Sequence, residues 1–272
     1  MSNLKFGIIQ GRLTQSPPGC LQWFPQQEWR SEFAKASELG ISFIELIAEI
    51  HHNPKNPIWS NDGIKEIKET ANDKKIVINS LCNDFIIENC ILNKDTIKQN
   101  INLLDQCKKL GIKKYIMPFF NESEINADNI EKFLKPLNII ADMANEYGIV
   151  ISLETILTGK ELLYLLDTLD NRNIHVVFDT GNRIAFGHNL SEDIELLSNK
   201  INHVHIKDKN TDNQNVILGT GLVNFSEVFI SLKKINYQGP YVFETSRGRD
   251  PVKTAKYNMQ IVDFFIENSK DV

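Results

Sequence analysis

The chain has 272 residues, of which 42% are hydrophobic and 24% charged, a composition typical of a globular protein with a large core. Its net charge of −5 and the lack of a Lys/Arg-rich block argue against a nucleic-acid partner, which normally meets a basic stripe. No apolar run approaches the roughly 20 residues that span a bilayer, and the N-terminus does not read as a signal peptide. We therefore expect neither a nucleic-acid-binding nor a membrane protein.

The four cysteines, Cys20, Cys82, Cys90 and Cys107, follow neither CxxC nor zinc-finger spacing. Free thiols in a reducing compartment are the simplest interpretation of this pattern. The sequence therefore predicts a cytoplasmic protein without disulfides.

Along the chain, eight strand-like apolar runs alternate with eight helical patterns. The strands are expected at 5–10, 41–47, 76–82, 114–120, 149–154, 175–179, 201–205 and 240–244. The helices are expected at about 28–40, 62–72, 97–110, 128–147, 159–169, 190–198, 225–235 and 252–266. Strict alternation predicts parallel strands, and eight units of this length predict an α/β fold, a (β/α)8 TIM barrel forming a single domain over residues 1–272.

A doubly wound open sheet also fits the alternation, but it would not bring the ends of strands five to eight to one point. No GxGxxG turn follows the first run, which argues against a dinucleotide-binding sheet. The closed barrel is therefore the favoured fold.

Each of the last four strands ends in a side chain that can bind a metal ion. These are Glu154, Asp179, His205 and Glu244. Side chains alternate across a strand, so each of the four shares a face that points away from bulky apolar neighbours such as Phe178. All four can point into one lumen, at the end of the barrel where such enzymes carry their active sites.

Three carboxylates and one imidazole suit one divalent metal ion, with Mn²⁺, Mg²⁺ or Co²⁺ preferred and Zn²⁺ tolerated. Such an ion keeps open positions for the carbonyl and hydroxyl oxygens of a sugar, and it would acidify the proton between them and stabilise an enediolate. Glu154 and Glu244 are the expected acid/base pair. Return of the proton to the same carbon gives an epimer, and delivery to the neighbouring carbon gives an isomer; the residues leave both outcomes open.

Several motifs resemble those of the xylose isomerase-like TIM barrels, the sugar phosphate isomerases/epimerases. They are FIEL in the second strand, FDTGN (178–182), HVHIKD (203–208), LGTGLVNF (218–225) and YQGPYVFE (237–244), and they are most similar to L-ribulose-5-phosphate and L-xylulose-5-phosphate 3-epimerases. The resemblance implies the same metal ligands and the same acid/base pair. It also implies substrate or second-layer contacts from Asn182 and Lys207, and a close-approach loop at Gly219 and Gly221.

The chain also departs from these relatives at positions that affect the substrate. Asn182 stands where free-ketose epimerases tend to carry a His, and Asn83 and Asp84 stand where phosphate-sugar epimerases tend to carry His-Arg. An acidic residue there would repel a phosphate. Arg12 at the barrel mouth could bind a carboxylate or phosphate, or pair with Glu45, which we also count as a substrate-binding candidate.

The sequence therefore predicts a metal-dependent sugar or sugar-phosphate epimerase or isomerase, with ketose 3-epimerisation favoured. The alternatives are an aldose-ketose or hydroxypyruvate-type isomerase, an inosose dehydratase, and, outside enzymes, a metal-binding carbohydrate-recognition module. An endonuclease of the same superfamily would need a His-rich multi-zinc site, whereas the chain has six scattered histidines. The expected partner is a small sugar or sugar phosphate. A homodimer or homotetramer is compatible by analogy, although no motif selects one.

Overall fold

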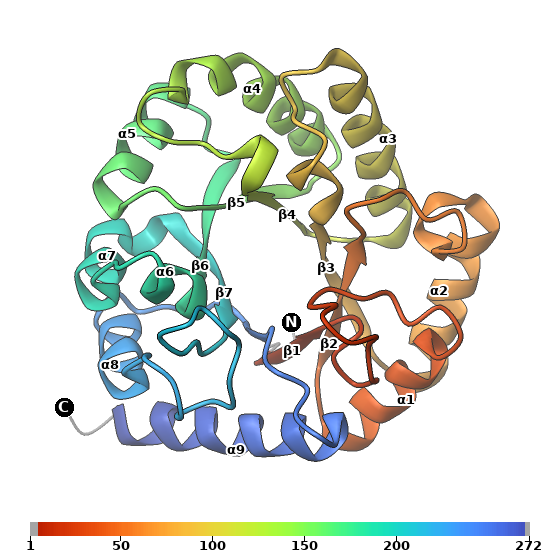
Figure 1. Ribbon diagram of the computed structural model, residues 1–272. Helices are drawn as coiled ribbons and strands as arrows, with labels where there is room; N and C mark the ends of the chain where they lie inside the picture. Colours follow the sequence, from red (N-terminus) through yellow and green to blue (C-terminus); the bar gives the residue numbers. More distant parts are fainter. Residues whose placement is uncertain (1–4, 270–272) are drawn as a thin grey trace.

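In the computed structural model, which describes residues 5–269, eight parallel strands close into a barrel in sequence order (Figure 1). The strands are β1 (Phe6–Ile9), β2 (Phe43–Ala48), β3 (Val77–Asn83), β4 (Lys114–Phe119), β5 (Val150–Thr155), β6 (Ile174–Asp179), β7 (Ile201–Ile206) and β8 (Tyr241–Phe243). Strand β8 pairs with β1 and completes the ring. The predicted TIM barrel fold is confirmed.

The helices form an outer ring around the strands, except for the short α6, which lies inside α7, nearer the barrel opening (Figure 1). They are α1 (Trp29–Leu39), α2 (Asn61–Lys74), α3 (Lys94–Leu110), α4 (Ile130–Glu146), α5 (Gly159–Leu169), α6 (Thr180–Ala185), α7 (Leu190–Leu197), α8 (Phe225–Lys234) and α9 (Pro251–Asn268). Short 3₁₀ turns are η1 (Pro57–Trp59), η2 (Asp84–Ile87), η3 (Asn121–Ser123) and η4 (Ser198–Lys200). Helix α6, which follows β6 directly, was not expected from the sequence. None of the helices described is long and apolar enough to cross a membrane.

Local sequence signals set where the helices begin and end. Thr158 opens α5 with a reciprocal capping box to Glu161, and Asn93 caps α3 by accepting from the Asp95 backbone N–H. Gly40 and Gly111 follow α1 and α3 with φ of 77° and 81°, a backbone conformation that costs glycine little. These stops return the chain to the barrel at the base of the next strand.

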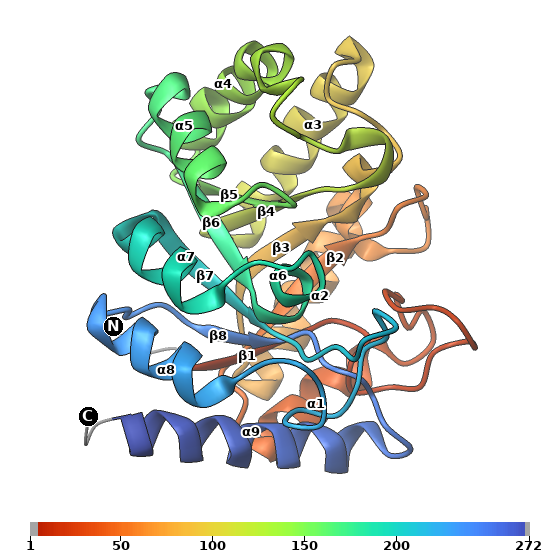
Figure 2. The same ribbon diagram turned by 60° about the vertical axis from the view of Figure 1, so that its left-hand side comes forward.

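The barrel wall holds the candidate ligands in fixed register. Asp179 lies beside His205 in the β6–β7 ladder, and Glu244 follows β8 directly. The neighbouring Val176, Phe178 and Val204 are fully buried apolar residues. The loops that follow β1, β7 and β8 all extend from the same end of the barrel (Figure 2). The strand ends and these loops therefore surround one opening.

Close packing at the first strand gives a test of the fold. Gly7 pairs with Phe43 across β1 and β2, and a Cβ atom at Gly7 would lie 2.2 Å from the Phe43 ring. Because Phe43 is fully buried, Gly7→Ala should lower the free energy of unfolding by about 1–3 kcal/mol, measured by urea denaturation. The double variant Gly7→Ala/Phe43→Leu should recover part of the loss. A single variant as stable as the parent would contradict this packing.

Candidate metal centre and active site

The four predicted ligand side chains meet inside the barrel, near its C-terminal end. One ligand atom from each of Glu154, Asp179, His205 and Glu244 lies within 4.8 Å of all the others. His205 Nδ1 is 3.6 Å from Glu154 Oε2, 3.9 Å from Asp179 Oδ2 and 3.2 Å from Glu244 Oε2. All four side chains are buried. The barrel therefore gathers residues from four strand ends into one cluster of three oxygens and one nitrogen.

The buried atoms of this cluster fit a divalent cation. Among the described residues, neither His205 Nδ1 nor Asp179 Oδ2 makes a well-aligned hydrogen bond, although Nδ1 lies 3.2 Å from Glu244 Oε2 and Asp179 Oδ2 lies 3.1 Å from Lys207 Nζ. Burying three carboxylates together is unfavourable unless a positive charge compensates them. Oxygen ligands with one imidazole suit Mn²⁺, Mg²⁺ or Co²⁺ and are acceptable to Zn²⁺. The donor set therefore fits a divalent metal ion.

Glu45 fixes the orientation of His205 from below. Its two oxygens lie 2.8 Å from His205 Nε2 and 2.8 Å from His203 Nε2, and Ser80 Oγ donates to it at 2.5 Å. Although burial opposes ionisation, the two imidazoles hold the pKa of Glu45 well below its usual range. A carboxylate at Nε2 leaves Nδ1 free to face the cluster. Glu45 thus supports the ligand set, and it does not line the cavity above it.

Lys207 and Asn182 lie over the carboxylates. Lys207 Nζ is 2.7 Å from Glu244 Oε1 and 3.1 Å from Asp179 Oδ2, while Asn182 Nδ2 donates to Glu154 Oε1 at 2.6 Å. Lys207 Nζ also donates to Asn182 Oδ1 at 3.4 Å. The side chains implied as substrate contacts therefore lie directly beside the predicted acid/base pair.

The charges in the cluster shift one another's ionisation. Burial raises the pKa of Asp179 to about 6 against the opposing effect of Lys207. The pKa of Glu244 falls well below its usual range despite burial, because Lys207 and His205 lie beside it. Burial also opposes the charge on Lys207, yet Asp179 and Glu244 raise its pKa. These groups therefore act as one strongly interacting set.

Arg12 reaches the same site from the loop after β1. Its guanidinium donates to the Thr245 carbonyl at 2.9 Å and to Gln22 at 2.6 Å, and it lies 3.5 Å from Glu244. The pairing of Arg12 with Glu45 that the sequence allowed is not formed, because Glu45 is enclosed by the two histidines and Ser80. Arg12 instead holds Glu244 and the end of β8 in place.

A cavity of about 550 Å³ opens above the cluster. It is lined by Gly19, Cys20, Leu21, Gln22, Ile50, Cys82, Asp84, Ile87, Pro118, Phe120, Asn121, Glu154, Asn182, Phe186, Lys207, Lys209, Asn213 and Glu244. Of the six predicted substrate-binding residues, Asn182 and Lys207 are in this lining; Arg12, Glu45, Gly219 and Gly221 are not. The cavity therefore places Glu154 and Glu244 where a small ligand can reach them.

A model of the xylose isomerase-like TIM barrel family matches residues 33–265, which is most of the chain. The chain belongs to this family. The resemblance inferred from its motifs is thereby confirmed.

Three known proteins show how far the similarity extends. The uncharacterized protein MJ1311 of Methanocaldococcus jannaschii is 35% identical over 130 residues, which are 43% of this chain and only 44% of that protein. The probable L-ribulose-5-phosphate 3-epimerase UlaE of Mycoplasma pneumoniae is 24% identical over 254 residues, 85% of this chain and 81% of that protein. The crystal structure of D-allulose 3-epimerase from Methylomonas sp. superposes with a TM-score of 0.76 at 19% identity, covering 97% of this chain and 98% of that one. That structure supports the fold alone.

In this xylose isomerase-like barrel, a buried aspartate that sequence reasoning missed organises the loop after β7. Asp208 accepts from the backbone N–H groups of Gly219 at 3.0 Å, Gly221 at 2.9 Å and Val223 at 3.1 Å. A Cβ atom at Gly221 would lie 2.3 Å from Asp208 Oδ1, which explains the glycine there. The two glycines thus bind Asp208 in this structure. The signal in the sequence was an aspartate at a strand end, before a glycine-containing loop.

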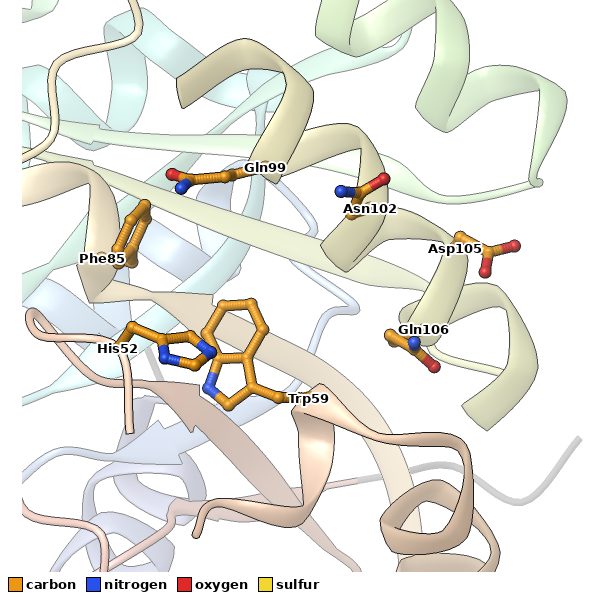
Figure 3. Close-up of a pocket in the computed structure, with 7 residues that line it drawn as sticks. All are labelled: His52, Trp59, Phe85, Gln99, Asn102, Asp105 and Gln106. Atoms are coloured by element: carbon orange, nitrogen blue, oxygen red, sulfur yellow. The ribbon is translucent and has the colours of Figure 1, made fainter. Parts of the chain in front are cut away.

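A second pocket, of about 390 Å³, lies on the flank of the barrel between η1 and α3 (Figure 3). It is lined by His52, Trp59, Phe85, Gln99, Asn102, Asp105 and Gln106. Its one carboxylate, Asp105, pairs with Lys109 at 2.7 Å, and none of the four clustered candidate ligands lines it. The cavity at the strand ends, which is lined by Glu154 and Glu244, is therefore the candidate active site.

The role of Asp208 can be tested with a substitution of nearly the same size and shape. Asp208→Asn replaces an acceptor oxygen with an amide that faces backbone N–H donors. We expect the free energy of unfolding to fall by about 1–3 kcal/mol and amide exchange at Gly219, Gly221 and Val223 to accelerate. Hydrogen-exchange measurements check this. Asp212→Asn, an exposed change in the same loop, serves as the control, and unaltered exchange in Asp208→Asn would contradict the anchoring role.

Proposed function

We propose that the chain is a divalent-metal-dependent sugar epimerase or isomerase, and most directly a ketose 3-epimerase. The observation that carries this is the buried cluster of Glu154, Asp179, His205 and Glu244 at the base of a cavity of about 550 Å³. Family membership supports the reaction class, since a similar protein in Mycoplasma pneumoniae is named a probable L-ribulose-5-phosphate 3-epimerase. The ligand is a small ketose.

The four clustered side chains would hold the ion, with Mn²⁺, Mg²⁺ or Co²⁺ preferred. When bound, the ion would supply positive charge that polarises the carbonyl and hydroxyl oxygens of the sugar and acidifies the proton between them. Glu45 would keep His205 in the tautomer that offers Nδ1 to the cluster. Lys207 and Asn182 would hold the carboxylates in place and donate hydrogen bonds to sugar oxygens.

Glu154 and Glu244 would carry the proton transfer. Glu154 lies near the end of β5 and Glu244 just after β8, so the two carboxylates enter the site from separated parts of the barrel wall. One removes the proton beside the carbonyl, and the other returns a proton from the opposite side, with the roles exchanged in the reverse direction. A return to the same carbon produces the epimer. Burial of both residues keeps bulk water from competing for the proton.

Solvent exchange tests this pair directly. Protein loaded with Mn²⁺ and incubated with a panel of ketoses in D₂O should incorporate deuterium at C3, measured by NMR. Glu154→Gln and Glu244→Gln should each lower the exchange rate by at least about 100-fold, because each removes a general acid/base. The exposed change Glu146→Gln is the control. Exchange at the parent rate in both site variants would eliminate the proposed pair.

The position of the label also separates the alternative functions. Deuterium at C1 would indicate an aldose-ketose isomerase. Metal binding without exchange into any sugar of the panel would indicate a non-catalytic carbohydrate-recognition module.

A second test concerns the support of the ligand set and needs no turnover. Glu45→Gln should weaken Mn²⁺ binding by about 10–100-fold, because the amide no longer fixes and charges the His205 ring as the carboxylate does. Isothermal titration calorimetry measures the affinity, and circular dichroism checks that the variant is folded. Glu38→Gln, an exposed change on α1, should bind as the parent does. Equal affinities in the folded Glu45→Gln variant and the parent would contradict this role.

A further inference from the structure

We propose that Asp84 is a specificity-determining residue that binds a hydroxyl group of an unphosphorylated ketose and excludes a phosphate ester from its side of the cavity. This inference rests on the proposed function and adds the substrate class. Asp84 is the first residue of η2, directly after β3, and it lines the same cavity as Glu154 and Glu244.

One oxygen of the Asp84 carboxylate can accept a hydrogen bond from a ligand. Its side chain is buried, with 2% of the residue exposed. Oδ1 accepts a weak hydrogen bond from the Cys82 thiol at 3.3 Å, whereas Oδ2 has no hydrogen-bond partner among the described residues. A buried polar atom without a partner is costly, and a hydroxyl donor from a ligand would remove that cost. A sugar presents such donors along its whole length.

The surroundings of Asp84 favour a neutral ligand. Ile50, Ile87, Pro118 and Phe120 line the cavity from the segments after β2 and β3 and from the end of β4, the strands next to Asp84. Phe120 stacks on Phe186 across the mouth, with ring centroids 6.2 Å apart and planes at 18°. In such apolar surroundings a carboxylate and a phosphate would repel each other with little screening. The same surroundings strengthen a hydrogen bond from a hydroxyl to the carboxylate.

The cations near Asp84 are already paired with other groups of the site. Of the residues that line it, two are cationic: Lys207 and Lys209. Lys207 is held by Asp179 and Glu244. Lys209 donates to Asn213 at 2.6 Å and follows β7, which lies opposite β3 in a ring of eight strands. Lys207 and Arg12 both interact electrostatically with Asp84, but each also lies beside Glu244. A phosphate near Asp84 would therefore meet a negative charge, and the nearby cations are already paired with carboxylates.

Equilibrium binding tests the proposal without relying on turnover. Mn²⁺-loaded protein is titrated calorimetrically with L-ribulose and L-ribulose 5-phosphate, and with D-fructose and D-fructose 6-phosphate. The titrations are run at pH 8 so that Asp84 is mostly ionised. Its pKa is raised to about 7, mainly by burial and next by the negative charge of Glu244. The parent should bind the free sugar of a pair at least about tenfold more tightly than its phosphate ester. Asp84→Asn should weaken binding of the free sugar about tenfold and tighten binding of the ester.

Two controls separate the outcomes. Asp128→Asn, an exposed change, should leave every affinity unaltered, and the affinity of Asp84→Asn for Mn²⁺ alone should match that of the parent. Tighter binding of the esters by the parent, or the same ratio in the parent and Asp84→Asn, would overturn the role of Asp84. Deuterium exchange in D₂O is measured on the same samples. If deuterium exchange occurs but the ratio of free-sugar to ester affinity is the same in Asp84→Asn and the parent, only the role of Asp84 is wrong. If no sugar undergoes exchange, the proposed function is wrong.

Discussion

The repulsion among three buried carboxylates is the constraint on which the rest of the site depends. Glu154, Asp179 and Glu244 surround His205 inside a barrel that excludes most water, so their charges interact strongly. Lys207 and Arg12 supply part of the compensating charge. Neither cation lies between His205 Nδ1 and the carboxylate oxygens that it faces. A bound cation would offset the remaining repulsion among the carboxylates. The proposed chemistry depends on that cation.

The supporting groups lie on strands, where the backbone ladder limits their movement. Glu45 on β2 pairs in register with Ser80 on β3, at a point where the ladder skips one residue of β3. That irregularity accompanies a carboxylate shared by two histidines and a hydroxyl group. Rigid placement of this kind keeps the imidazole in one orientation, which a ligand for a metal ion needs.

The strand ends and the loops contribute different parts of the candidate active site. Three of the four clustered residues lie on strands and Glu244 directly follows one, while η2, α6 and the loop anchored by Asp208 shape the cavity above them. Loops vary more easily than strands, because few buried contacts depend on them. One barrel can therefore keep a proton-transfer centre and change the sugar it accepts. Asp84, the first residue of η2, lies where strand β3 gives way to such a variable segment.

The barrel, its eight units and the four clustered residues could be predicted from the sequence alone, because strand alternation and strand-end position are local properties of the chain. It also indicated that Asn182 and Lys207 would reach the site. The partner of each polar group, by contrast, became apparent only in the folded protein. Arg12 meets Glu244, Glu45 lies beneath His205, and Asp208 ties down Gly219 and Gly221. These contacts join residues from different strands and loops, and their choice depends on barrel register and loop path, which no local pattern encodes.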